Sequence, residues 1–160
     1  MTFIDKEPVK RVEKIIKEFD ENLSVSVLKT SARTALEAAS SLNCDVGAIV
    51  KSLLFKTDNK FCLFLIAGDK KASLKKIKKN IKFSDVSMAS ADEVKSITGY
   101  TIGGVSPVGH INDVDIYIDN SLERFNFLFA AAGHPNCIFK ISFLNLKKIT
   151  KGVIEDIIEW

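Results

Sequence analysis

A lysine in the middle of an apolar stretch is the first feature of this sequence that could do chemistry. Residues 48–56 predict a β-strand, in which successive side chains point to opposite faces. Lys51 therefore shares one face with large apolar residues, namely Ile49, Leu53 and Phe55. Its ammonium group either reaches water along its aliphatic stem or faces an anion across a cleft. The spacing alone favours the structural alternative.

A glycine-rich loop at residues 99–109 is the second such feature. Glycines let a backbone approach a ligand closely and present its N–H groups, and Pro107 fixes one side of the loop. The segment lacks both the Gly-Lys-Ser/Thr of a phosphate-binding Walker loop and the glycine spacing of a dinucleotide fold. A tight turn and a ligand-binding loop are about equally compatible with it.

Two further features are weaker. Small residues lead into Gly133-His134-Pro135, which leaves room for a ligand beside the imidazole, although a lone histidine is more often a surface or internally satisfied residue. A helix predicted at residues 73–80 and its flanks carry a cluster of lysines, which either form a solvated face or bind a phosphate backbone. These are Lys70, Lys71, Lys75, Lys76, Lys78, Lys79 and Lys82.

Other chemistries have little support in the composition. The chain has two histidines and three widely spaced cysteines without a CxxC pair, so we expect neither a structural metal nor a disulfide framework. We also find no Ser-His-Asp order and no pair of catalytic carboxylates. We therefore expect no cofactor, and catalysis that depends on positioning, backbone donors and Lys51.

The elements that position these residues indicate one mixed α/β domain over residues 1–160. The 160 residues, 46% apolar and 27% charged, suffice for a single core. Helical spacing or caps predict helices at 8–20, 32–42, 73–80, 91–98 and 145–149, with Ser31 as the cap of the second. Strands are predicted at 24–29, 48–56, 61–67, 114–119, 127–132 and 137–142, followed by a tail at 153–159. We expect about six or seven strands.

The remaining bulk properties concern location. The N-terminus has acids where a secretory signal needs bases and an apolar run, and no stretch approaches the roughly 18 apolar residues of a membrane span. The net charge of +3 does not by itself mark a nucleic-acid binder. We expect a cytoplasmic protein with no membrane partner.

Taken in order, these motifs resemble the YbaK/prolyl-tRNA-synthetase-associated domain family of aminoacyl-tRNA deacylases. The lysine strand 49–55 and the Gly-x-x-x-Pro loop 103–107 are the specific parts of the resemblance, which runs from about residue 30 to the C-terminus. The alanine-rich helix at 34–39, Gly68-Asp69, the segment 118–122 and Gly133-His134-Pro135 accompany them. Residues 1–29, an N-terminal helix and strand, are less typical of the family.

The resemblance implies a mixed α/β fold around a central, partly barrel-like sheet surrounded by helices. It also implies a trans-editing enzyme that hydrolyses the ester of a mischarged tRNA, with the tRNA 3′ end and an aminoacyl-tRNA synthetase as partners. One methylene in an apolar pocket discriminates by only about 1–3 kcal/mol, so errors in charging need a second sieve. The alternative hypotheses are a non-catalytic module that binds tRNA or nucleotides, and a regulatory protein.

The resemblance also implies the roles of individual residues. Lys51 would bind the phosphate or adenosine end of the substrate, and the loop at Gly103 and Gly104 would hold the aminoacyl carbonyl through its N–H groups. The attacking group would be a water or a ribose hydroxyl of the tRNA. The other expected substrate-binding residues are Ser52, Val105, Ser106, Pro107, Gly109, Asp119, Gly133 and His134.

Overall fold

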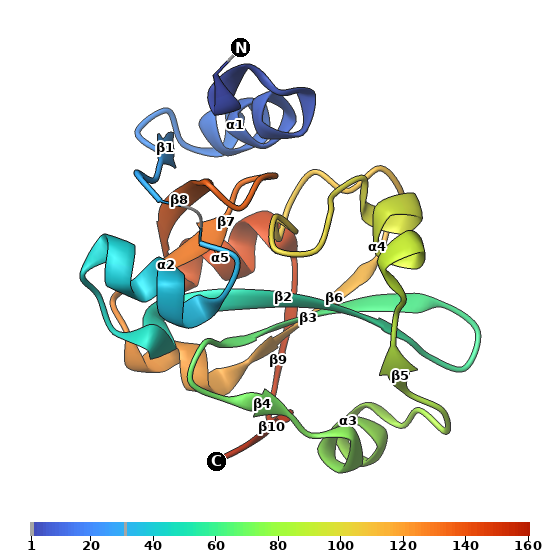
Figure 1. Cartoon of the computed structure of the whole chain (residues 1–160). Coiled ribbons are helices and arrows are strands. Elements are labelled where there is room, and N and C mark those ends of the chain that lie inside the picture. The colour runs from blue at the N-terminus through green and yellow to red at the C-terminus, as the bar shows by residue number, and fades with distance from the viewer. Residues whose placement is uncertain (1, 31) are drawn as a thin grey trace.

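An eight-stranded mixed sheet forms the centre of the computed structural model, which describes residues 2–30 and 32–160 (Figure 1). The sheet order is β1-β8-β7-β2-β3-β6-β9, with β5 paired to β2 off this path. Its strands are β1 (Val25–Val27), β2 (Ile49–Lys56), β3 (Phe61–Ala67), β5 (Ser87–Met88), β6 (Asp115–Asp119), β7 (Phe127–Ala131), β8 (Cys137–Ser142) and β9 (Val153–Glu155). A second, two-stranded sheet pairs β4 (Lys71–Ala72) with β10 (Ile158–Glu159).

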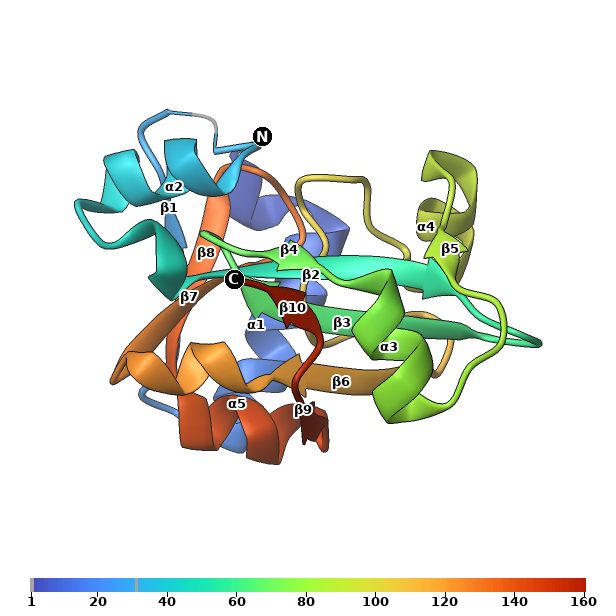
Figure 2. The same ribbon diagram turned by 90° about the horizontal axis from the view of Figure 1, so that it is seen from below.

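Helices cover both faces of this sheet. The α-helices are α1 (Glu7–Phe19), α2 (Ala35–Leu42), α3 (Leu74–Ile81), α4 (Ala91–Thr98) and α5 (Phe143–Thr150). Short 3-10 helices are η1 (Phe3–Asp5), η2 (Val46–Ala48) and η3 (Asn120–Arg124). Figures 1 and 2 show α1 on one face of the sheet, and α3 with the β4–β10 pair on the other.

Local capping explains where two helices begin and end. The Ser90 side chain accepts the N–H of Glu93, whose carboxylate in turn accepts the N–H of Ser90, so α4 starts with a full capping box. It ends at Gly99, in the left-handed conformation, as predicted. The second helix begins later than predicted, at Ala35, because the Thr34 side chain accepts the N–H of Glu37 and caps it. The predicted cap, Ser31, lies outside the described residues.

The core is built around β3. Six consecutive residues of this strand, Cys62 to Ala67, have no exposed surface, because the sheet is covered on both faces. On one face the Phe64 ring packs edge-on against Phe55, at 5.1 Å between centroids, and stacks on Tyr117 at 5.4 Å. The continuous apolar run of β3 is thus explained by its position in the centre of the sheet.

The predicted fold class is confirmed: helices surround a central mixed sheet. The sheet has eight strands where we expected six or seven. The tail at 153–159 holds two short strands, β9 and β10, and the two-residue strand β5 has no alternating apolar pattern. The sheet is not a closed barrel, since its order ends at β1 and β9, which do not pair with each other in the described part of the chain.

We predict that Phe64→Ala lowers the free energy of unfolding by about 3–5 kcal/mol, because it empties a fully buried aromatic site. Urea denaturation measures this loss. Phe127→Ala is the matched control: Phe127 is 53% exposed and contacts Lys140 on the surface, so it should lose less than about 1 kcal/mol. Equal losses in the two variants would contradict the central position of β3.

Candidate functional site

A gap in the hydrogen-bonding of β2 defines the site. Along one edge β2 pairs with β3 over seven residues, but along the other it pairs with β7 only at Ile49 and Val50 and with β5 only at Phe55 and Lys56. No strand among the described residues pairs with residues 51–54 on that second edge. Apart from the carbonyl of Leu54, which accepts the N–H of Ala89, this stretch is therefore open to a ligand.

Ser52 directs its backbone into the gap. The carbonyl of Ile49 accepts the N–H of Gly68 at 2.8 Å on the β3 side, whereas the carbonyl of Leu54 accepts the N–H of Ala89 at 3.0 Å on the β5 side. Neighbouring residues of a strand direct their N–H and C=O groups to opposite edges. Ser52 lies two residues before Leu54, so its N–H and its C=O both point into the gap. Its hydroxyl oxygen is buried and has no hydrogen-bond partner in the described residues.

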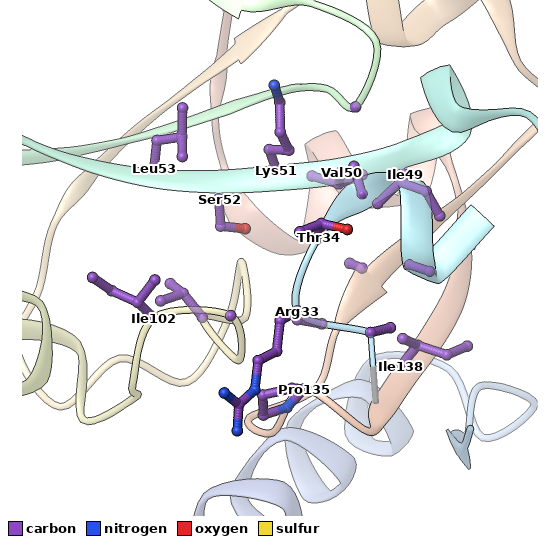
Figure 3. A pocket seen from close by; sticks show the side chains of 18 of the residues that line it. Arg33, Thr34, Ile49, Val50, Lys51, Ser52, Leu53, Ile102, Pro135 and Ile138 are labelled. Atoms are coloured by element: carbon purple, nitrogen blue, oxygen red, sulfur yellow. The ribbon is translucent and has the colours of Figure 1, made fainter. Parts of the chain in front are cut away.

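A cavity of about 490 Å³ lies at this gap, which is within the usual range for small-molecule sites. Its walls come from the start of α2, from β2 and β7, from the glycine loop and from the turn before β8, and many of them are small or aliphatic (Figure 3). Three large apolar side chains at the cavity, Leu36, Met88 and Ile102, are 60–69% exposed. Exposed apolar side chains gathered in this way are typical of a binding site.

Lys51 lines the cavity from the opposite face of β2 to Ser52. Figure 3 shows its side chain pointing away from Ile102 and the loop, whereas Ser52 points toward them. The ammonium donates to the carbonyl of Lys70. Desolvation of the half-buried side chain lowers the pKa of Lys51, while the charge of Asp69 opposes this shift. Lys51 and the loop thus lie on opposite sides of β2, and both line the cavity (Figure 3).

Asp69 is held beside Lys51 by a bidentate ion pair. The Arg124 guanidinium donates to the two carboxylate oxygens of Asp69 at 2.8 and 3.1 Å. This pairing keeps the pKa of Asp69 below its usual value. The carboxylate is therefore an ionised neighbour that favours the charged form of Lys51.

The glycine loop offers fewer free donors than predicted. Gly103, Val105 and Ile102 line the cavity. The N–H of Gly104 is occupied, because it donates to the carbonyl of Thr101 at 2.9 Å. The N–H groups of Gly103 and Val105 take part in no hydrogen bond between described residues, and they are the donors that remain for a ligand.

Gly104 has a different role, which is close packing against the turn before β8. A Cβ on Gly104 would lie 2.9 Å from both N and Cα of His134, closer than carbon atoms approach in proteins. The glycine loop and the segment 133–134 therefore meet backbone to backbone. This contact fixes one wall of the cavity.

The other loop residues that we predicted build the loop and do not line the cavity. Ser106 is fully buried, and its hydroxyl accepts the N–H of Val108 at 3.3 Å. The carbonyl of Gly109 accepts from Arg11 at 2.7 Å and from the Tyr100 hydroxyl at 2.9 Å. Pro107 lines a separate, smaller cavity on the α1 side. Their contribution to substrate binding stays a prediction.

His134 lies next to the cavity wall, of which its neighbour Pro135 is part. The ring packs on Phe3 at 4.4 Å between centroids, and Nδ1 accepts the N–H of Asn136 at 3.0 Å. Desolvation lowers the pKa of His134. Gly133 packs its Cα against the backbone of Pro8. The N-terminal helix thus holds this turn in place.

Asp119 is engaged elsewhere. Its carboxylate is fully buried and accepts the N–H of Ser121 at 2.9 Å and that of Ile157 at 2.8 Å. It does not line the cavity, and the contacts tie the start of η3 to the segment before β10. Its geometry is that of a structural residue, and its expected contribution to substrate binding stays a prediction.

Two parts of the site had no signal in the sequence. Arg33 and Thr34 line the cavity from the loop before α2, and Met88 and Ala89 line it from β5 and its continuation. Arg33 precedes the alanine-rich helix, where the sequence gives no signal, and its segment is held by the hydrogen bond from the N–H of Ala32 to the carbonyl of Pro135. Met88 and Ala89 carry no motif, and they reach the site because β5 pairs with β2. Within the described residues no group of three or more His, Cys, Asp and Glu side chains could hold a metal ion. No helix in that part of the chain could span a membrane.

Comparisons with known proteins identify this arrangement. The sequence profile of the Aminoacyl-tRNA editing domain matches residues 29–149. The chain belongs to this editing-domain family. The lysine strand, the glycine loop and the turn at 133–135 all lie within the matched residues, whereas α1 and the strands β1, β9 and β10 lie outside them.

Named relatives of this editing domain fall into two kinds. The proline–tRNA ligase of Macrococcus caseolyticus is 36% identical over 120 residues, which are 75% of this chain but only 21% of the ligase. The chain thus spans about a fifth of the length of that relative. The uncharacterised protein YwhH of Bacillus subtilis is 35% identical over 119 residues, which are 74% of this chain and 75% of YwhH.

The fold is also found in solved structures of similar length. One, described as a candidate trans-editing enzyme for prolyl tRNA synthetase, is 33% identical and superposes with a TM-score of 0.90. The match covers 97% of this chain and 99% of that one. The predicted resemblance to this family is confirmed.

We predict that Gly104→Ala destabilises the editing domain by about 1–3 kcal/mol, because the added Cβ overlaps the backbone of His134. Thermal or urea unfolding measures the change. Ser96→Ala on the exposed surface of α4 is the control and should change stability by less than about 0.5 kcal/mol. A Gly104→Ala protein as stable as the wild type would show that the contact between the two loops is not tight.

Proposed function

We propose that this editing domain is an aminoacyl-tRNA deacylase, which hydrolyses the ester of a mischarged tRNA. The observation that carries the proposal is the cavity at the open edge of β2, which is lined by Lys51 and by Gly103 and Val105, whose N–H groups have no hydrogen-bond partner among the described residues. The family of the chain supports the chemistry. Translation fidelity is then its physiological role, with tRNA as substrate and a synthetase as the source of the mischarged species.

In this proposal the substrate lies across the edge of β2. The aminoacyl group occupies the side of Ser52 and the glycine loop, and the terminal nucleotide the side of Lys51. A half-buried ammonium interacts more strongly with a phosphate than an exposed one does, since water screens it less. Lys51 therefore anchors the anionic end of the substrate, in exchange for its present contact with the Lys70 carbonyl.

The reaction does not use a protein nucleophile. The described residues that line the cavity include no Asp, Glu or His that could act as a general base. Cys137 lines the cavity, but burial raises the pKa of its thiol, which disfavours the reactive thiolate. A water, or a free hydroxyl of the terminal ribose, is left as the attacking group.

The chemical step can be written with a water. Its oxygen adds to the ester carbonyl carbon, and the N–H groups of Gly103 and Val105 stabilise the oxyanion that forms. The bond from this carbon to the ribose oxygen then breaks. The proton lost by the water goes to the ribose oxygen, so that the products are a free amino acid and an uncharged tRNA.

We predict that Lys51→Met lowers kcat/KM for deacylation by about 10²-fold, because it removes the charge that anchors the anionic end of the substrate and keeps the aliphatic stem. The measurement is release of amino acid from a panel of mischarged tRNAs. Lys56→Met is the matched control: it alters an exposed lysine of the same strand, paired with Glu93 at 3.7 Å, and should leave the rate unchanged.

Two outcomes of this panel would contradict the proposal. Equal rates for wild type and Lys51→Met, with the fold intact, would remove Lys51 from the reaction. Saturable binding of tRNA without deacylation of any species would instead favour the non-catalytic binding module, the alternative supported by the absence of a nucleophile.

We predict that Ser52→Ala raises KM about fivefold, the loss expected for one hydrogen bond of about 1 kcal/mol to the aminoacyl group. Stability should not fall, since the buried hydroxyl has no partner to lose. Ser121→Ala is the control, because Ser121 carries another unpaired buried hydroxyl, outside the cavity lining. An unchanged KM for Ser52→Ala would assign its hydroxyl no role in binding.

A further inference from the structure

Trp160 is the most exposed large apolar residue of the described chain, with 75% of its surface accessible. It directly follows β10, which pairs with β4 in the register Glu159 to Lys71. This pairing places the indole beside Lys70. The residue lies outside the range matched by the family profile, so the family does not define its role.

Two cationic side chains contact the indole. The Lys70 ammonium lies 4.3 Å from the centre of the Trp160 ring, and the Arg124 guanidinium carbon lies 5.7 Å from it. Arg124 is itself fixed by its ion pair with Asp69. Cation–π contacts of this kind orient the ring, while most of its surface remains open to a ligand.

These residues are continuous with the candidate site. Lys51 donates to the carbonyl of Lys70, and the side chain of Lys70 lies over the indole. Lys70 therefore connects Lys51 to Trp160. The β4–β10 pair lies on the same face of the sheet as α3 (Figure 2). We call Lys70, Lys71, Arg124 and Trp160 the tryptophan platform.

The charge of the platform is positive. With Lys51 it has four cationic side chains. Asp69 pairs with Lys70 and Arg124, and Glu159 is the register partner of Lys71. Helix α3 follows β4 directly and adds three exposed lysines, Lys75, Lys78 and Lys79. An exposed aromatic ring among cations is the arrangement by which proteins bind single-stranded nucleic acid, with bases stacked on the ring and phosphates on the cations.

We propose that the tryptophan platform binds the unpaired nucleotides that precede the terminal adenosine of the tRNA. One base stacks on Trp160, and the phosphates on either side contact Lys70 and Lys71. The terminal nucleotide then continues past Lys51 to the edge of β2. This proposal rests on the proposed function, because it extends the binding site of the same substrate.

The single tryptophan of the chain provides a direct test. Uncharged tRNA, and a short RNA that ends in the same unpaired nucleotides, should both quench its fluorescence saturably. Binding of the RNA, followed by the anisotropy of a dye at its 5′ end, should weaken about tenfold in Trp160→Ala, within the range for loss of one stacked base. Trp160→Phe should retain most of the affinity, since a stacking surface remains.

The charge requirement has its own matched pair. Lys70→Ala should weaken binding and reduce its dependence on salt concentration, because one phosphate contact is lost. Lys17→Ala removes one charge from the exposed surface of α1, on the other face of the sheet (Figures 1 and 2), and should leave binding unchanged. Equal effects of the two variants would show that RNA responds only to the overall positive charge of the protein, and would overturn the proposal.

The outcomes separate this proposal from the proposed function. Quenching of the wild-type fluorescence and weaker RNA binding by Trp160→Ala, without deacylation of any tRNA by the wild type, would support the platform and reject the enzyme. Deacylation with an unchanged KM in Trp160→Ala, and no quenching at saturating tRNA, would support the enzyme and reject the platform. Circular dichroism shows whether the variants are folded. We expect Trp160→Ala to fold, because Trp160 is exposed.

Discussion

The interrupted pairing along one edge of β2 is the constraint on which the rest of the site depends. A buried backbone group without a hydrogen-bond partner costs about 1–3 kcal/mol, so folded chains normally pair every strand that they enclose. Here β7 leaves β2 after Val50 and β5 joins it only at Phe55. The backbone between them stays available to a ligand, and the remaining elements form the walls around it.

This constraint also explains how a site without a nucleophile can be specific. Lys51 and Ser52, adjacent in sequence, line the cavity from opposite faces of β2 (Figure 3), so in the proposed function they bind opposite ends of one substrate. The N–H groups of Gly103 and Val105, which have no partner in the part of the chain that the structure describes, come from a loop held in place by Gly104 and Tyr100. The position of these donors is fixed by several contacts of the loop backbone, and such preorganised donors are what a catalytic site needs.

The sequence predicted the elements well and the orientation of side chains less well. Apolar runs and caps located β2, β3 and α4, and the order of motifs indicated the family. Periodicity placed Lys51 on one face but could not show that the glycine loop lies on the other, because this depends on how distant segments pack. The occupied N–H of Gly104, the carboxylate contacts of Asp119 and the short strand β5 likewise arise from tertiary contacts.

The backbone contact between Gly104 and His134 has a consequence for how the protein folds. The cavity has walls from residues as far apart as Ala32 and Ile138, so its closure requires contacts of long sequence separation, which form slowly. Hairpin β2–β3 is local and can form early, whereas the two loops meet only when β6, β7 and β8 have joined the sheet. The editing cavity is therefore among the last parts of the structure to assemble, and a partly folded chain exposes the open edge of β2 to other chains.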